Sequence, residues 1–238
     1  GWTLAGRAAP TRPVTLAQLL SHTAGVNLRS VHGYPAGSPL PTLRQILDGA
    51  PPATTAPVRI EHEPGVYRYS GGGFLVVQEL LEEVSGLSFA EVMEREVFAP
   101  AGMTHSSFAV PLPPAARAQA ATPHDVDGSA FPELVYPDAA PAGLWTTPTD
   151  LARLLLALAR AREGTDESLL SQRLARRMTT SVAEMGHAGV SIGLGPALER
   201  HGAAVYFGHD GWNEGFLSVA RATLDGRHGA VVMANGAE

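Results

Sequence analysis

The fold is decided by one stretch of sequence, Arg68-Tyr69-Ser70-Gly71-Gly72-Gly73-Phe74, in which polar residues and three glycines precede an apolar run. The apolar residues that follow recur close to the i, i+3, i+7 spacing of a helical face, which predicts a half-buried helix. Gly86 is suited to end it, because glycine readily adopts the left-handed conformation found at helix C-termini. Three glycines at a helix start are costly unless backbone or ligand must approach closely, so we expect such an approach here.

Other segments combine an N-cap residue with apolar residues at helical spacing. The expected caps are Thr15, the capping box of Ser88 with Glu91, and either Thr149 or Asp150, while Pro100 is expected to stop the helix that Ser88 begins. The helices predicted in this way cover 15–20, 42–48, 88–99, 149–162 and 167–178.

The character of the chain changes after about His187, where apolar or alternating runs lie between turn residues. These runs predict strands at 189–194, 203–209, 216–223 and 230–235, and Asp225-Gly226 is a hairpin signal. Strands that follow one another without helices between them indicate an antiparallel sheet. The predicted fold class is therefore α+β, with a mainly helical domain with long loops at 1–186 and an antiparallel part of an α/β domain at 187–238.

Composition limits the possible partners. The 238 residues are 45% hydrophobic and carry a formal net charge of -6, which argues against non-specific binding to nucleic acid or to anionic membrane. No apolar run approaches the roughly 20 residues of a membrane span. With no cysteine, thiol chemistry and thiolate metal sites are excluded and the compartment stays open, so a small-molecule partner is expected.

Tyr69 is a candidate proton carrier because the turn before the predicted helix can hold its hydroxyl in a cleft. A free phenol has a pKa near 10, so a tyrosine that acts as a base at neutral pH needs a shift of roughly 3 units, which a nearby cation must supply. The alternative is a tyrosine at a helix edge with its ring in the core and its hydroxyl in water.

A second candidate group lies in His209-Asp210-Gly211-Trp212, at the end of a predicted strand. A histidine at a strand end beside glycine is well placed to line a pocket, although most of the nine histidines are expected to be surface or core groups. Gly211 allows a substrate to approach the strand edge, and the backbone N–H of Trp212 can point at a developing oxyanion.

Five segments stand in order along nearly the whole chain: Thr15-Leu16-Ala17-Gln18-Leu19-Leu20-Ser21-His22-Thr23-Ala24-Gly25, Tyr69-Ser70-Gly71, the segment 98–103, the segment 142–151, and His209-Asp210-Gly211. Together they resemble the serine β-lactamase and penicillin-binding-protein-like family. In that family the first segment reads Thr-Leu-x-x-Leu-Leu-x-His-Thr-Ser-Gly, the second Tyr-x-Asn, and the last Lys-Thr-Gly or His-x-Gly. The family includes class C β-lactamases, family VIII esterases, D-aminopeptidases and D-alanyl-D-alanine carboxypeptidases.

The resemblance implies a mechanism in which the serine of a Ser-x-x-Lys motif attacks an ester, amide or peptide carbonyl and forms an acyl-enzyme. It implies that Tyr69 is the base, that His209 lines the cleft, and that Trp212 supplies one oxyanion N–H. Ser70, Gly71 and Gly211 are then expected to contact the substrate. No metal or cofactor is expected.

Departures from the family pattern change these expectations. The chain contains no lysine, so Ser-x-x-Lys, which lies upstream of Thr15 in the family, is absent, and this fragment is expected to be inactive. We expect that an N-terminal segment is missing, and that the last strand has lost its covering layer at the C-terminus. Gly71 in place of asparagine and His209 in place of lysine favour an esterase or peptidase over a β-lactamase.

Alternatives remain open at this point. The same cleft is compatible with a non-catalytic module that binds peptide or cell-wall fragments. Gly189-Val190-Ser191-Ile192-Gly193 fits a nucleophile elbow, yet it falls within a predicted strand rather than between a strand and a helix. Glu61-His62-Glu63 lacks a second histidine at ligand spacing and is expected to be a solvated loop.

Overall fold

The computed structural model describes residues 2–6 and 13–236. Its helices, in chain order, are α1 (Leu16–Leu20), α2 (Leu43–Asp48), α3 (Gly71–Ser85), α4 (Phe89–Met93), the π-helical turn η1 (Glu94–Phe98), α5 (Ala99–Ala101), α6 (Pro114–Arg117), α7 (Ala139–Ala142), α8 (Pro148–Glu163) and α9 (Gln172–Met178). Its strands are β1 (Ala5–Gly6), β2 (Tyr34–Pro35), β3 (Arg59–Ile60), β4 (Leu134–Val135), β5 (Ala183–Glu184), β6 (Val190–Ile192), β7 (Ala197–His201), β8 (Ala204–Asn213), β9 (Phe216–Thr223) and β10 (Gly229–Ala234).

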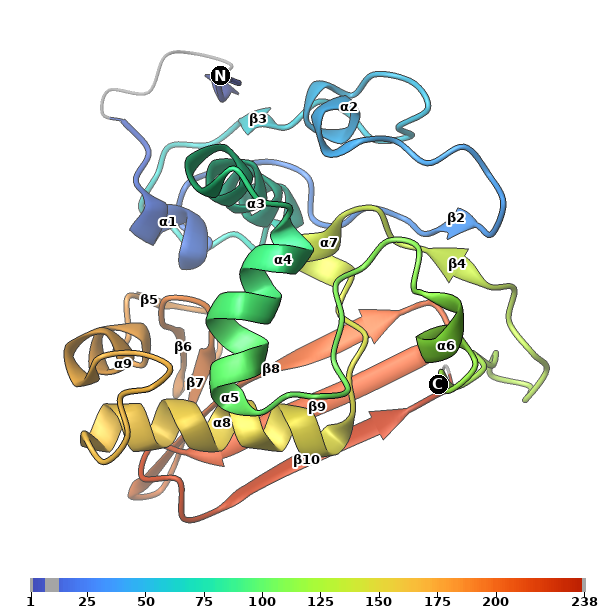
Figure 1. Ribbon diagram of the computed structural model, residues 1–238. Coiled ribbons are helices and arrows are strands. Elements are labelled where there is room, and N and C mark those ends of the chain that lie inside the picture. Colours follow the sequence, from blue (N-terminus) through green and yellow to red (C-terminus); the bar gives the residue numbers. More distant parts are fainter. Residues whose placement is uncertain (1, 7–12, 237–238) are drawn as a thin grey trace.

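A helical layer lies on one side of the molecule and an antiparallel sheet on the other (Figure 1). The helical layer holds α1, α2 and α3 around a core that includes Ile46, Leu47 and Leu75. The run α4–η1–α5 extends from α3 toward α8, which crosses the sheet (Figure 1). The predicted α+β class is confirmed.

Within the described residues the large sheet has the strand order β10-β9-β8-β7-β6-β5, and every neighbouring pair is antiparallel. One face packs on α8 and α9, with Leu158 and Ala161 from α8 against Phe207 and Ala222 from the sheet. The sequence missed β5 and β7, and it ended β8 too early. That strand continues to Asn213, so the stretch from His209 to Asn213 belongs to one strand.

Two of the three glycines at the start of α3, Gly71 and Gly72, are explained by backbone that passes close to them, whereas Gly73 has no neighbour closer than 3.8 Å. The N–H groups of Gly71 and Gly72 donate to the carbonyls of Arg29 and Leu28, each at 2.9 Å. A Cβ on Gly72 would stand 2.7 Å from the carbonyl oxygen of Asn27. The expected close approach is therefore made by the protein's own chain, which fixes α3 against the segment 27–29.

Two helix starts differ from the prediction. Thr147, rather than Thr149 or Asp150, caps α8, because its side chain accepts the N–H of Asp150 and Pro148 takes the first helical position. α9 begins at Gln172 rather than Glu167. Glu167 lies before the helix, and its carboxylate accepts the backbone N–H of Gln172, the first helical residue, at 3.0 Å.

Pro100 does not stop the helix that Ser88 begins. The chain passes from α4 through η1 into α5 without leaving helical backbone angles, and Pro100 lies in α5 directly after the π-helical turn. Gly102 ends α5 instead, in the left-handed conformation with φ of 69°. The Ser88 and Glu91 capping box is present as predicted.

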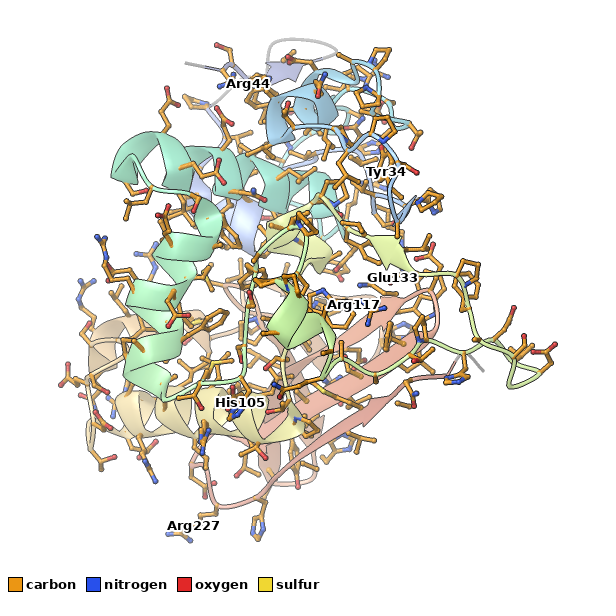
Figure 2. The ribbon with its side chains drawn as sticks, turned by 45° about the vertical axis from the view of Figure 1, so that its right-hand side comes forward. Tyr34, Arg44, His105, Arg117, Glu133 and Arg227 are labelled. Carbon is orange, nitrogen blue, oxygen red and sulfur yellow. The ribbon has the colours of Figure 1, made fainter. Side chains whose placement is uncertain are left out.

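Asp150 ties the start of α8 to the loop after α5. Its carboxylate is buried and accepts the backbone N–H of His105 at 2.7 Å, the hydroxyl of Ser106 at 2.9 Å and a guanidinium N–H of Arg153 at 2.8 Å. Figure 2 labels His105, which lies in the loop after α5. These bonds fix one wall of the space between the helical layer and the sheet.

The division into 1–186 and 187–238 remains a prediction, and its two outer ends lie outside the described residues. β5 lies before the expected boundary and pairs with β6. α8 and α9 share a core with the sheet although they precede it in the chain. Within 2–6 and 13–236, no helix is both long and apolar enough to cross a bilayer.

Candidate active site

A cavity of about 1260 Å³ lies between the helical layer and β8. Tyr69 and Gly71 at the start of α3 line one side, and His209, Gly211 and Trp212 on β8 line another. Its apolar wall includes Trp145 and Phe216, whose rings meet edge to face with centroids 5.8 Å apart. The two stretches singled out in the sequence therefore border one cavity.

Tyr69 and His209 face each other across this cavity. Their ring centroids are 6.1 Å apart and the ring planes differ by 34°. Burial raises the pKa of Tyr69 above its usual value, and the positive charge of Arg29, whose guanidinium carbon lies 5.6 Å from the ring centroid, opposes that rise. The phenol is therefore protonated at neutral pH, and Arg29 alone does not make it a base.

His209 is an exposed residue that lines the cavity. The loss of water lowers the pKa of His209, and the neighbouring Asp210 opposes this through its backbone and its charge. Asp210 in turn pairs with Arg221 of β9, with an N to O distance of 2.9 Å. The imidazole is therefore neutral at pH 7, with one donor and one acceptor nitrogen.

His22, at the end of α1, is a third ring of the site that sequence reasoning missed. It is 4% exposed, and its ring centroid lies 4.4 Å from that of Tyr69 and 5.2 Å from that of Phe74. Desolvation, followed by the charge of His209, lowers the pKa of His22 to about 4. Its backbone φ is +54°, which is uncommon for a residue with a side chain.

Ser70 is not among the residues that line the cavity, and its expected role in substrate binding remains a prediction. Its side chain is buried, donates to the carbonyl of Asn27 at 2.7 Å and accepts the N–H of Gly73 at 3.0 Å. Its backbone N–H donates to Nδ1 of His22 at 3.1 Å. Ser70 is thus the N-cap that holds the first turn of α3 in place.

Gly211 and Trp212 lie on the part of β8 that extends beyond its pairing with β7. That pairing reaches only to Gly208, whereas the pairing with β9 continues to Asn213. A Cβ on Gly211 would stand 2.3 Å from Oγ of Ser218, so that hydroxyl would have to rotate away to admit a side chain. The indole of Trp212 is largely exposed, so its backbone rather than its ring is the candidate functional group.

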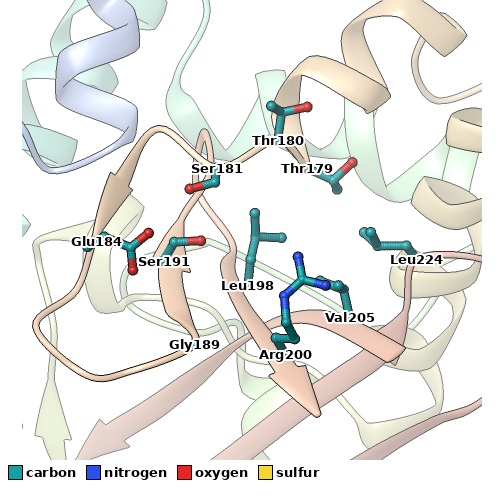
Figure 3. A pocket seen from close by; sticks show the side chains of 10 residues that line it. All are labelled: Thr179, Thr180, Ser181, Glu184, Gly189, Ser191, Leu198, Arg200, Val205 and Leu224. Carbon is teal, nitrogen blue, oxygen red and sulfur yellow. The ribbon is translucent and has the colours of Figure 1, made fainter. Parts of the chain in front are cut away.

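Ser191 does not lie on a nucleophile elbow. It belongs to β6, and β7 rather than a helix follows. It lines a separate cavity of about 410 Å³ beside Arg200 and Ser181, shown in Figure 3, and no histidine or aspartate lines that cavity. The geometry that the elbow requires is therefore missing, and the α/β-hydrolase alternative is wrong.

The described part of the chain contains no group of three His, Asp or Glu side chains that could hold a metal ion. In Glu61-His62-Glu63, Glu61 pairs with Arg59 at 2.7 Å and His62 is exposed. This segment has the character of a surface loop.

Comparisons with known proteins agree with this architecture. A D-stereospecific amidohydrolase from Streptomyces sp. superimposes with a TM-score of 0.74 at 21% identity, covering 98% of this chain and 71% of that one. The penicillin-binding protein from Bacillus halodurans superimposes with a TM-score of 0.71 at 26% identity, covering 97% and 70%. A Bacillus subtilis (strain 168) protein named as a penicillin-binding protein, PbpX, is 33% identical over 96 residues, which span 40% of this chain but only 22% of that relative.

The resemblance seen in the sequence motifs is thus supported independently over most of the fold. A family model described as Beta-lactamase matches residues 4–238. The chain therefore belongs to the beta-lactamase family.

Proposed function

We propose that this chain forms the substrate cleft of a serine hydrolase that cleaves an ester or amide through an acyl-enzyme. Tyr69 is the base that moves the proton of the nucleophilic serine, His209 binds substrate across the cleft, and the N–H of Trp212 stabilises the oxyanion. The single observation that carries the proposal is the approach of Tyr69 and His209, 6.1 Å apart, across one cavity.

Tyr69 needs a cation in addition to Arg29, whose charge does not offset the effect of burial. Burial raises the pKa of Tyr69, and only Arg29 opposes it. A positive charge within about 4 to 6 Å of the phenol would favour the phenolate. The lysine of a Ser-x-x-Lys motif is a group of this kind, and the same motif supplies the nucleophile.

The 238 residues contain no lysine, so they hold no Ser-x-x-Lys motif. We therefore propose that these residues do not acylate by themselves. The 238 residues provide the base Tyr69, the cleft and one oxyanion donor. The nucleophilic serine and the lysine that activates it come from sequence outside these residues.

A fluorophosphonate probe tests the proposal. It labels a chain in which a Ser-x-x-Lys segment precedes Thr15, at the serine of that segment, and it leaves the 238-residue chain unlabelled. Mass spectrometry of the labelled peptide identifies the site. Labelling of the 238-residue chain at one of its own serines would contradict the proposal that the nucleophile lies outside these residues.

A non-catalytic binding module is the second candidate, favoured by the missing Ser-x-x-Lys motif beside a fully formed cavity. The binding-module hypothesis predicts that the full-length protein binds small peptides at equilibrium and that none of its serines reacts with the fluorophosphonate probe. Covalent labelling of the natural chain decides against it.

A further inference from the structure

Arg29 is held beside the proposed base because two stretches of backbone pack closely. Its carbonyl accepts the N–H of Gly71 at 2.9 Å, and the carbonyl of Leu28 accepts the N–H of Gly72 at 2.9 Å. These two bonds tie the segment that contains Arg29 to the turn that carries Tyr69.

The bend that brings Arg29 to this place is costly for the chain. Leu28 has a φ of +62°, which is uncommon for a residue with a side chain. The segment is also held from its other side, where the side-chain oxygen of Asn27 accepts the N–H of Arg59 at 2.7 Å. Strained backbone of this kind persists only where the surrounding structure fixes it, and it is often found at functional sites.

This close packing leaves no room for the family's asparagine at position 71. A Cβ on Gly71 would stand 2.9 Å from the carbonyl oxygen of Arg29, so a side chain there would force one of the two backbones to move. The departure from Tyr-x-Asn is therefore linked to the position of Arg29. Where the family pattern has an amide two residues after the tyrosine, this chain has a guanidinium beside the phenol.

The guanidinium of Arg29 lies over the ring of Tyr69. Its central carbon is 5.6 Å from the ring centroid, which is within the range of a cation–π contact. Within the part of the chain that the structure describes, no carboxylate forms an ion pair with Arg29. Its full positive charge therefore acts on the phenol.

The other titratable groups beside Tyr69 are uncharged at neutral pH. The ring centroids of His22 and His209 lie 4.4 Å and 6.1 Å from that of Tyr69, and the loss of water lowers the pKa of both histidines. Burial raises the pKa of Tyr67, so this second phenol keeps its proton. Among these groups, Arg29 alone carries a permanent positive charge.

We propose that Arg29 is a positioning residue of the site, which stabilises the phenolate form of Tyr69 that accepts the proton of the nucleophilic serine. The proton passes from the serine hydroxyl to the phenolate oxygen, and the guanidinium keeps its own protons throughout. The inference rests on the proposed function and adds a group that acts on its base. Arg29 acts together with the lysine of Ser-x-x-Lys and does not replace it.

The ionisation of position 69 in the 238-residue chain tests the proposal without catalysis. Difluorotyrosine incorporated at this position gives a fluorine NMR signal from one phenol, which ionises at lower pH than tyrosine. Arg29→Gln should raise the pKa of this phenol by about 0.5 to 1 unit, the effect expected of one charge at 5.6 Å near the protein surface. Arg29→Lys keeps the charge and should restore most of the difference.

Arg68→Gln is the matched control. It removes the same charge from the residue next to Tyr69, but Arg68 is not among the groups that shift the pKa of Tyr69. It should change the pKa at position 69 less than half as much as Arg29→Gln does. The proposal is overturned if Arg29→Gln leaves this pKa unchanged or lowers it, or if Arg68→Gln raises it equally.

A chain that carries Ser-x-x-Lys separates this inference from the proposed function. In that chain the rate of fluorophosphonate labelling should rise with pH, and Arg29→Gln should move the rise to higher pH by about 0.5 to 1 unit. Labelling with the same pH profile in both proteins would overturn the inference and leave the proposed function. Absence of labelling, together with the expected pKa shift in the 238-residue chain, would reject the proposed function although Arg29 still acts on Tyr69.

Discussion

The ring of His22 lies 4.4 Å from the ring of Tyr69, tilted by 34°, while its Nδ1 accepts the N–H of the next residue, Ser70. One imidazole therefore holds both the side chain of the proposed base and the backbone that carries it. Because Nδ1 is the acceptor, the neutral ring carries its proton on Nε2. Protonation of Nδ1 would break the bond to Ser70 and release the turn that positions Tyr69.

Tyr69→Phe, in a chain that carries Ser-x-x-Lys, should slow acylation about 100-fold, the usual contribution of a general base. The rate of covalent labelling by fluorophosphonate measures it. Tyr67→Phe is the control, since Tyr67 contacts the same histidine edge to face, with centroids 6.1 Å apart, but does not line the cavity. A Tyr69→Phe chain that acylates at the wild-type rate would remove Tyr69 from the mechanism.

His22 should make the protein less stable in mild acid. The folded imidazole has a pKa of about 4 and an ordinary histidine 6.5, so between these values the unfolded chain binds more protons and stability falls as pH falls. From pH 7 to 5 this loss is about 2 kcal/mol. His22→Asn, which tolerates the positive φ, should lose about 2 kcal/mol less over that interval in urea unfolding. An equal loss in both proteins would contradict the assignment.

Asp138 should have the opposite dependence. Its folded pKa of about 7 lies above the ordinary 3.8, so the unfolded chain loses its proton first and stability falls as pH rises from about 4 to 7. Between pH 5 and 8 the expected loss is about 3 kcal/mol. Asp138→Asn removes the titration, and urea unfolding at the two values should show a correspondingly smaller loss. If the wild-type and the Asn variant lose stability alike, the buried carboxylate is already ionised at pH 5.

Gly72→Ala should destabilise the protein by about 1 to 3 kcal/mol, because the new Cβ would stand 2.7 Å from a backbone oxygen that cannot move freely. Gly73→Ala is the matched control. Its Cβ would have no neighbour closer than 3.8 Å, so the better helix propensity of alanine should stabilise the protein by about 0.5 to 1 kcal/mol. Thermal unfolding of both variants measures the difference, and equal effects would contradict the close approach of the segment 27–29.

Much of the fold could be predicted from local patterns. The helix after Gly73, its end at Gly86 and the antiparallel strands after His187 each follow from periodicity and turn residues within a short window. Thr147 was missed because two threonines and an aspartate stand within four residues, and each is a good cap. Only the position of Pro148 in the first turn separates them.

Motif resemblance singled out Tyr69 and His209, and the structure places both on one cavity, although the predicted strand end at His209 was wrong because β8 continues to Asn213. His22 was missed because its burial depends on residues 45 to 52 positions later, which periodicity cannot reveal. Its place in Ser21-His22-Thr23-Ala24-Gly25, the most specific segment of the resemblance, was the available signal. The cap role of Ser70 was missed because a serine before glycines suits a helix cap and a substrate contact equally well, and only the fold shows that its side chain accepts the N–H of Gly73.

Among the described strands, β10 pairs with β9 alone, and Val232 stands opposite Val219 with both side chains exposed. A strand with free main-chain groups on one side and neighbouring apolar side chains is a template for another strand. Light scattering of the purified 238-residue chain should therefore show self-association that increases with concentration, and Val232→Lys should suppress it.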